Sequence, residues 1–158
     1  MNAKKSYKAY WYKSEVQWEA SRRGKICSAQ KPELKISSPP EFKGEAGFWT
    51  PEDLFVASVN ACTMMTFLAY AHHKNLPLVG YESEAEGLLE YVDGKYRFTK
   101  VVLRPHIELG SEDGLEQARQ ILEDAHKGCF VTNSTTAEVE LFPLIRFAPV
   151  KSGEGAVS

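Results

Sequence analysis

The order of apolar and polar positions divides this chain into stretches with the period of a strand and stretches with the period of a helix. Alternation and β-prone residues predict strands at residues 7–12, 16–20, 25–29, 34–36, 79–92, 96–109 and 136–142. Helical spacing and an uncharged run predict helices at residues 51–73 and 111–127. Strands, a helix, a hairpin, a second helix and a last strand follow one another in this order. The pattern therefore predicts an α+β fold.

The start of the first helix is marked by residues that favour helix N-termini. Thr50 is placed to cap it, Pro51 suits the first helical position, and Asp53 completes a Thr-x-x-acid capping pattern. A helix is therefore expected from Pro51 to about His73.

The strands at 79–92 and 96–109 are separated by a dipeptide that favours a tight turn. Asp93-Gly94 is a strong type I′ signal and predicts a β-hairpin. Pro105 lacks an N–H group, so we expect an edge position or a bulge late in the second strand. A short helical turn is expected to begin at Cys129. Residues 1–148 are expected to form one domain, followed by a polar, flexible tail at 149–158.

Composition limits the classes of function that fit the chain. It has 158 residues, of which 43% are hydrophobic, and a formal net charge of −2. This balance gives no electrostatic basis for binding nucleic acid or an anionic membrane. The first residues lack the apolar segment of a signal peptide, and the 3 cysteines form no paired framework. We therefore expect a cytoplasmic protein.

The stretch from Leu54 to Ala71 has no charged residue and is just long enough to be weighed as a membrane span. Ser58, Asn60 and Thr63 interrupt it with polar groups, and leucine and isoleucine are scarce in it. A helix that is apolar on all sides is buried either in protein or in lipid. We expect a helix buried at the centre of a domain or a dimer, and no membrane association.

Cys62 and Cys129 are the leading candidates for chemistry. They are 67 residues apart and lie in different predicted elements, which fits neither a zinc ribbon nor a disulfide framework. The pattern favours redox chemistry, and the alternative is that both are structural thiols. Ser58 and Thr66 lie one helical turn to either side of Cys62. Their hydroxyls either line a polar pocket with Thr63 or bond back to helix carbonyls.

Charged residues elsewhere in the chain could support a reactive thiol. A thiolate that attacks a peroxide needs a nearby cation, and an arginine held by a carboxylate supplies one. Arg22 or Arg23, with Glu52, could provide this pair, and the alternative is an ordinary surface ion pair. His126-x-x-Cys129 has metal-ligand spacing but no second pair, so no metal is expected. Cys27 lies in a predicted strand and is interpreted as structural.

Two segments resemble the OsmC/Ohr family of osmotically inducible and organic-hydroperoxide-resistance proteins. Thr-Pro-Glu-Asp-Leu-Phe-Val-Ala-Ser-Val-Asn-Ala-Cys at 50–62 resembles that family's PEELLxAAxxxCxxxT helix. Ala-His-Lys-Gly-Cys-Phe-Val-Thr-Asn-Ser at 125–134 resembles its AHxxCPVSNS motif, with Phe130 in place of the proline. The resemblance covers roughly residues 5–145.

The resemblance implies an intertwined α+β homodimer with antiparallel sheets, a long buried central helix and active sites at the subunit interface. It also implies a thiol-dependent peroxidase that needs no bound cofactor and reduces organic hydroperoxides or hydrogen peroxide. Cys62 would form a sulfenic acid, and Cys129 would resolve it as a disulfide. Arg22 matches the family's arginine, and Glu52 matches the glutamate paired with it. A dithiol, either small or on a lipoylated or thiol protein, would then reduce the disulfide.

Bulky organic hydroperoxides are the favoured substrates, because apolar side chains are expected to form a pocket near the thiol. The alternative is that these side chains are ordinary core residues. They are Phe48, Trp49, Met64, Met65 and Phe67. Glu52 and Cys62 are ten residues apart, or ~15 Å along a helix, so Glu52 acts through an arginine or at the partner's site. A monomer is therefore expected to be inactive. The alternatives are a non-enzymatic binding or redox-sensing module and a cysteine hydrolase with His126 as base.

Overall fold

The structure is a computed structural model that describes residues 7–148. The chain separates into two compact units, one ending at Leu54 and the other beginning at Phe55. The tail predicted at 149–158 lies outside the described residues. A single domain over residues 1–148 stays a prediction.

The N-terminal unit is a small antiparallel sheet in the order β1-β2-β3. Its strands are β1 (Glu15–Ala20), β2 (Arg23–Cys27) and β3 (Leu34–Ser37), and a short 3₁₀ turn, η1 (Pro40–Phe42), follows. The strand predicted at 7–12 is wrong, because residues 7–14 have no regular structure. Alternation alone cannot make a strand without a neighbour to pair with, and Trp11 is 98% exposed.

The long helix α1 (Pro51–His73) begins where its capping residues predicted. The Thr50 amide donates to Asp53 Oδ2 at 3.0 Å, and the Asp53 amide donates to Thr50 Oγ1 at 3.1 Å. This reciprocal pair satisfies two amide groups at the helix N-terminus. Asn75, with φ of 52°, stops the chain from continuing as a helix.

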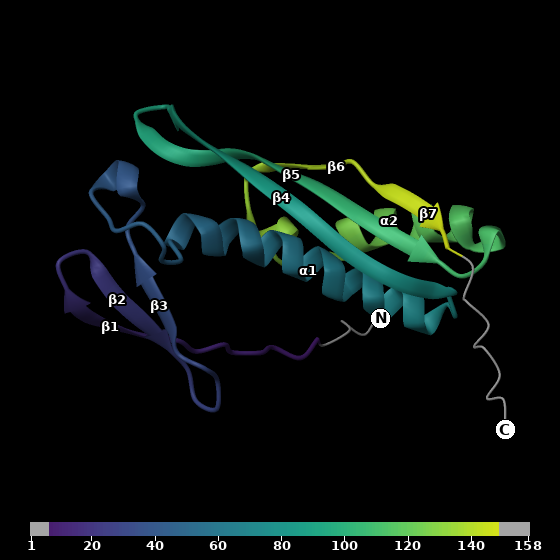
Figure 1. Ribbon diagram of the computed structural model, residues 1–158, viewed down its shortest axis with the longest axis horizontal. Coiled ribbons are helices and arrows are strands. Elements are labelled where there is room, and N and C mark those ends of the chain that lie inside the picture. Colours follow the sequence, from purple (N-terminus) through teal and green to yellow (C-terminus); the bar gives the residue numbers. More distant parts are fainter. Residues whose placement is uncertain (1–6, 149–158) are drawn as a thin grey trace, which may run out of the picture. The chain divides into compact units, whose positions relative to one another are not determined.

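The predicted hairpin is confirmed as β4 (Leu78–Val92) and β5 (Lys95–Leu109). Asp93 and Gly94 both have positive φ, 53° and 80°, as a type I′ turn requires. The β4–β5 register shifts at two places, near Leu78 and near Leu88. In Figure 1 the hairpin runs the length of the C-terminal unit above α1.

The opposite edge of β5 carries two short parallel strands, β6 (Glu138–Leu141) and β7 (Leu144–Phe147). The strand predicted at 136–142 is therefore confirmed in part, and β7 was not predicted. The expected edge position or bulge for Pro105 is wrong, since β5 is the central strand and no register shift lies there. Pro105 falls between the residues of β5 that pair with β6 and those that pair with β7, so its missing N–H breaks neither parallel ladder.

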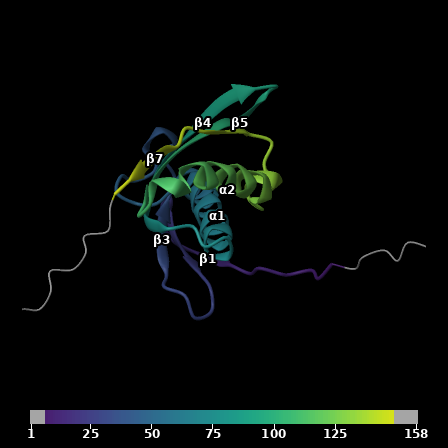
Figure 2. The same ribbon diagram turned by 90° about the vertical axis from the view of Figure 1, so that its right-hand side faces the viewer.

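The second predicted helix forms as a 3₁₀ turn, η2 (Glu112–Gly114), followed by α2 (Leu115–Gly128). Figures 1 and 2 show α1 and α2 on the same side of the β4–β5 sheet. One core cluster joins α1, β5 and α2 through Phe67, Ala71, Leu76, Ile107, Leu109, Ala118, Ile121, Leu122 and Ala125. A second, smaller cluster of Val59, Val101, Leu103 and Ala137 lies further along β5. The fold thus fixes the middle of α1 against the sheet.

Only one stripe of α1 is buried within the chain. Val59, Thr63, Phe67 and Ala71, four residues apart, lie on it. Other apolar side chains of the helix, such as Phe55 and Leu68, are only partly buried, and Met65 is 59% exposed. By length and composition α1 is the one described helix that could cross a membrane, with a mean hydropathy of 1.6, a test that soluble core helices also pass. Within a single chain, the expected burial of this helix is therefore only partial.

Candidate thiol site

The fold brings together the two cysteines that the sequence places 67 residues apart. Cys62 lies in the middle of α1, and Cys129 follows the last residue of α2. Their thiol groups are within hydrogen-bonding contact, and both are free thiols. Two thiols in contact can be oxidised to a disulfide.

Cys129 is fully enclosed, with 0% of the residue exposed. The Thr63 hydroxyl, on α1, lies 3.8 Å from its sulfur, and the Thr132 amide donates to the same sulfur at 3.5 Å. Thr63 is itself buried and also donates to the Val59 carbonyl at 3.0 Å. Cys129 therefore sits in a small polar cradle inside the core.

Cys62 is half-buried, unlike Cys129. The backbone N–H groups of Val131 and Phe130 favour negative charge on its sulfur. Together with Thr132, three successive amides of the segment after α2 therefore face the two thiols. Amides arranged in this way stabilise negative charge on sulfur.

The short helical turn predicted to begin at Cys129 is present, although its 3₁₀ residues start later in the segment. Cys129 has extended backbone angles, φ −70° and ψ 115°, and ends α2. A 3₁₀ turn, η3 (Thr132–Ser134), starts three residues later. The Asn133 amide donates to the Cys129 carbonyl at 3.0 Å and ties this turn to the cysteine. The Thr132 amide at the start of this turn faces the Cys129 sulfur, as expected of a cysteine that precedes a helical turn.

The two thiols differ in acidity because their surroundings differ. Burial raises the pKa of Cys62, the amides of Val131 and Phe130 oppose the rise, and the neighbouring Cys129 adds to it, so the pKa ends above its ordinary value. Burial also acts to raise the pKa of Cys129. Hydrogen bonds from Thr132, Cys62 and Thr63 outweigh it, so this pKa is lowered. Within the chain, negative charge on the pair is favoured at Cys129.

Ser58 and Thr66 do not line a polar pocket beside Cys62, which was one of the two alternatives that the sequence left open. Ser58 donates to the Phe55 carbonyl at 2.7 Å, and Thr66 donates to the Cys62 carbonyl at 2.8 Å. Both therefore bond back to their own helix, as the alternative reading held. The contact of Thr63 with Cys129 was missed, because only the fold brings α1 against the segment after α2.

The segment that carries Cys129 is also positioned by a close contact between the two helices. A Cβ atom on Gly128 would stand 2.7 Å from Tyr70 Oη and 3.7 Å from Thr66 Cγ2. Glycine therefore lets the end of α2 approach the side chains of α1 that follow Cys62 by one and two turns. This contact fixes the position of Cys129 along the axis of α1.

The predicted arginine and glutamate lie in the N-terminal unit. Arg22 is exposed in the turn before β2, and Arg23 begins the strand. Arg23 pairs with Glu45, with Nε–Oε1 at 3.4 Å, and its guanidinium carbon lies 5.9 Å from the centre of the Phe48 ring.

Glu52 lies in the first turn of α1, and its Oε2 atom is buried without a hydrogen-bond partner among the described residues. An ion pair between Glu52 and either Arg22 or Arg23 is absent from the salt bridges of residues 7–148. The pairing of an arginine with Glu52 stays a prediction.

The third cysteine has a different environment. Cys27 ends β2, and its thiol donates to Glu33 Oε1 at 3.7 Å. The same carboxylate forms an ion pair with Lys25 at 2.7 Å. These contacts agree with a structural role for Cys27 in the small sheet.

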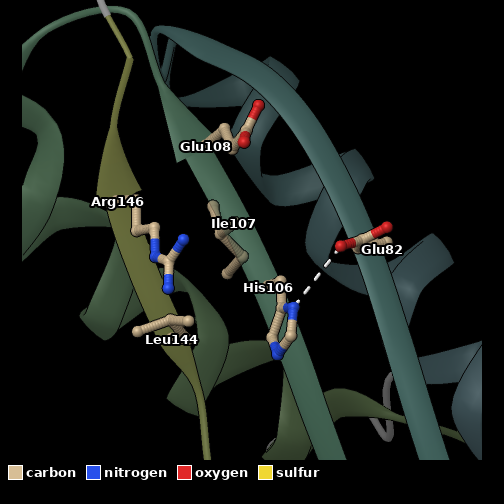
Figure 3. A pocket seen from close by; sticks show the side chains of 6 residues that line it. All are labelled: Glu82, His106, Ile107, Glu108, Leu144 and Arg146. Carbon is tan, nitrogen blue, oxygen red and sulfur yellow. Dashed lines mark hydrogen bonds and ion pairs between the residues drawn. The ribbon is translucent and has the colours of Figure 1, made fainter.

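A shallow hollow of about 120 Å³ on the outer face of the large sheet is a second feature to weigh. Figure 3 shows its lining residues, Glu82, His106, Ile107, Glu108, Leu144 and Arg146. His106 Nδ1 lies 3.4 Å from Glu82 Oε1 across β4 and β5. Residues 7–148 hold no group of three or more histidine, cysteine or acidic side chains that could bind a metal ion. We interpret this hollow as part of a solvated, ion-paired sheet face.

Two curated relatives are identical to the chain at about a quarter of the aligned positions. It is 24% identical over 109 residues to the uncharacterized protein YmaD of Bacillus subtilis, covering 67% of this chain and 73% of that protein. It is also 24% identical over 133 residues to the uncharacterized protein ACIAD3023 of Acinetobacter baylyi, covering 82% and 90%.

Solved structures give the same fold. An OsmC-like protein of unknown function from Vibrio cholerae superimposes with a TM-score of 0.80 at 26% identity, covering 86% of this chain and all (100%) of that one. An organic hydroperoxide resistance protein from Elizabethkingia anophelis gives a TM-score of 0.71 at 19% identity, covering 90% and 100%. The fold is thus the α+β OsmC-like fold. The family model for OsmC-like protein matches residues 44–141, which include both cysteines of the pair, and this chain belongs to that family.

Proposed function

We propose that this protein is a thiol-dependent peroxidase that reduces organic hydroperoxides, and hydrogen peroxide as a further substrate, through Cys62 and Cys129. One observation carries the proposal. Two free thiols from different elements are in contact, and one of them is accessible while the other is buried. This is the arrangement that a two-cysteine sulfenic acid and disulfide cycle needs.

Accessibility supports Cys62 as the residue of the first step. A hydroperoxide cannot reach Cys129, which has no exposed surface, but it can reach the half-buried Cys62. The raised pKa of Cys62 makes it a poor nucleophile by itself. An added cation would lower that pKa, and Arg22 is proposed for this role because it matches the family's arginine, with Arg23 as the alternative. The unpartnered carboxylate oxygen of Glu52 would orient that arginine.

The proposed cycle balances as follows. The Cys62 thiolate attacks the terminal oxygen of the hydroperoxide, the O–O bond breaks, and an alcohol leaves after taking up a proton. Cys62 is then a sulfenic acid. Cys129 attacks the Cys62 sulfur, the S–O bond breaks, water leaves, and a disulfide forms. A dithiol reduces this disulfide and becomes oxidised in its place, so no bound cofactor is needed.

A homodimer is proposed as the active form. The faces of α1 that are not buried within the chain are apolar, and such surfaces are usually covered by a partner. Trp11 and Trp18, at 98% and 79% exposed, add uncovered aromatic surface in the N-terminal unit. A second copy of the chain would cover both and complete the site with its charged residues, so an isolated monomer is expected to be inactive. Free thiols fit a reducing cytoplasm, where we propose that the protein works.

Organic hydroperoxides are proposed as the preferred substrates. Proteins of the same fold from Elizabethkingia anophelis and Vibrio cholerae are named organic hydroperoxide resistance proteins. Met65, three residues after Cys62 on α1 and 59% exposed, remains available to an apolar substrate pocket. Phe67 does not, because it is fully buried in the core.

A dimeric binding or redox-sensing module is the second candidate. The observation that favours it is the raised pKa of Cys62, because a protonated thiol reacts slowly with peroxide. Such a module would keep the cysteine pair without turning over peroxide.

Rapid mixing separates the two candidates. Reduced wild type, Cys62→Ser and Cys129→Ser are mixed with cumene hydroperoxide and, separately, with hydrogen peroxide, and Cys27→Ser serves as the matched control. We expect fast stoichiometric peroxide loss in the wild type and the control, and none in Cys62→Ser. Cys129→Ser is expected to consume one equivalent and stop at a sulfenic acid that dimedone traps. Peroxide loss no faster than with a free thiol would refute the peroxidase and favour the sensing module.

A further inference from the structure

The complete burial of Cys129 has a consequence for the reduction of the disulfide. A residue with 0% exposure within one chain stays enclosed in any oligomer, because association can only cover more surface. Cys62 lies on a half-exposed part of α1. A reductant from solution can therefore reach only one of the two sulfurs without local unfolding.

The residues around Cys129 can supply hydrogen-bond donors, which stabilise the negative charge of a leaving thiolate. The Thr132 amide donates to the Cys129 sulfur at 3.5 Å. The Thr63 hydroxyl lies 3.8 Å from the same sulfur, and its single proton, which the Val59 carbonyl accepts at 3.0 Å, can turn to the sulfur when a thiolate forms there. A disulfide is cleaved faster when the departing sulfur is the better thiolate. The lowered pKa of Cys129 agrees with this geometry.

We propose that the reducing dithiol attacks the Cys62 sulfur and that Cys129 leaves as a thiolate held by Thr63 and Thr132. The inference rests on the proposed function, because it assigns the second half of that cycle. The thiolate of the reductant forms a bond to Cys62, the Cys62–Cys129 bond breaks, and its electron pair goes to Cys129. The second thiol of the reductant then attacks the reductant's own sulfur, closes a ring and releases Cys62.

This order of events also sets which reductants succeed. After the first attack, the Cys129 thiolate remains beside the mixed disulfide on Cys62, and its return would expel a monothiol. A dithiol escapes this reversal, since its second thiol is held next to its own sulfur. Thr63 and Thr132 are thus positioning residues for Cys129.

The site of attack is tested without using peroxide. The protein in a Cys27→Ser background is oxidised with diamide and mixed with excess 2-mercaptoethanol in a rapid-quench device. Acid stops the reaction within milliseconds, before the Cys129 thiolate can expel the monothiol, and the adduct is mapped by peptide mass spectrometry. We expect the mixed disulfide on Cys62 and a free Cys129. Adducts on Cys129, or a failure of diamide to link the pair, would overturn the inference. Because diamide replaces peroxide, a missing peroxidase activity leaves this result readable.

Single-thiol variants give a second test of thiol accessibility, which does not require trapping the short-lived mixed disulfide. In the Cys27→Ser background, Cys129→Ser leaves only Cys62, and Cys62→Ser leaves only Cys129. We expect Ellman's reagent to modify Cys62 at least about tenfold faster than Cys129, since burial limits attack. Equal rates in the two folded variants, checked by circular dichroism, would refute an enclosed Cys129.

The cradle is tested with nearly isosteric substitutions. Thr63→Val removes the hydroxyl and is expected to slow cleavage of the diamide-formed disulfide by dithiothreitol about three- to tenfold. Thr63→Ser keeps the hydroxyl and is expected to restore the rate. Thr66→Val is the matched control, because its hydroxyl bonds the Cys62 carbonyl and neither sulfur. An unchanged rate in Thr63→Val, or equal slowing in Thr66→Val, would overturn the role of Thr63.

Discussion

Phe67 holds the middle of α1 against the sheet, and its truncation gives a quantitative test of the core. The side chain is 0% exposed, and its ring centre lies 5.4 Å from that of Tyr81. Phe67→Ala removes the ring from the cluster shared by α1, β5 and α2. Lost transfer energy and the remaining cavity together cost about 3–5 kcal/mol. For a chain of this size, this is a fall of roughly 6–20 °C in Tm.

The assay is urea unfolding followed by circular dichroism at one fixed protein concentration, since a dimer's stability depends on concentration. Phe67→Leu, which keeps most of the volume, is expected to lose only about 1–1.5 kcal/mol. Tyr91→Ala is the matched aromatic control, because Tyr91 is 64% exposed at the tip of the hairpin and its loss should cost at most about 1 kcal/mol. If Phe67→Ala costs no more than Tyr91→Ala, the packing described for α1 is wrong.

Three further substitutions test the site and its supports. Cys129→Ser removes a neighbour that raises the pKa of Cys62, so that pKa should fall. Iodoacetamide should then alkylate Cys62 faster at neutral pH. An unchanged pH profile of alkylation would contradict the contact between the two cysteines. Gly87→Ala should lower the free energy of unfolding, measured in urea, by about 1–3 kcal/mol, because the new Cβ would stand 2.5 Å from Val56 Cγ2. A neutral result would show that α1 and β4 are further apart. Thr50→Ala should cost about 1 kcal/mol through loss of the helix cap, whereas Thr50→Ser should cost much less, and equal losses would argue against the cap.

The parts of the fold that the sequence predicts well are those decided by neighbouring residues. The start of α1 depends on Thr50 and Asp53, three positions apart, and the hairpin turn depends on Asp93 and Gly94. In each case the hydrogen bonds or backbone angles that make the element are local, so the sequence pattern is sufficient.

The features that the sequence failed to predict depend on contacts between residues that are distant in the sequence. Residues 7–12 have the composition of a strand but no strand beside them in the chain. The break between β6 and β7 near residues 142–143 depends on where Pro105 falls in β5. The same reason applies at the site. The motifs singled out Cys62 and Cys129, and the Thr132 amide is a local neighbour of Cys129, whereas Thr63 reaches that sulfur only once α1 meets the segment after α2.

The most direct test of the central claim is the thiol content of the protein after one equivalent of cumene hydroperoxide. Mass spectrometry of the intact chain and of its peptides reads the product at each cysteine. The account predicts the loss of two hydrogens and a disulfide between Cys62 and Cys129, with Cys27 still free. A sulfinic acid on Cys62 beside a free Cys129, a disulfide that includes Cys27, or an unreacted protein would contradict it.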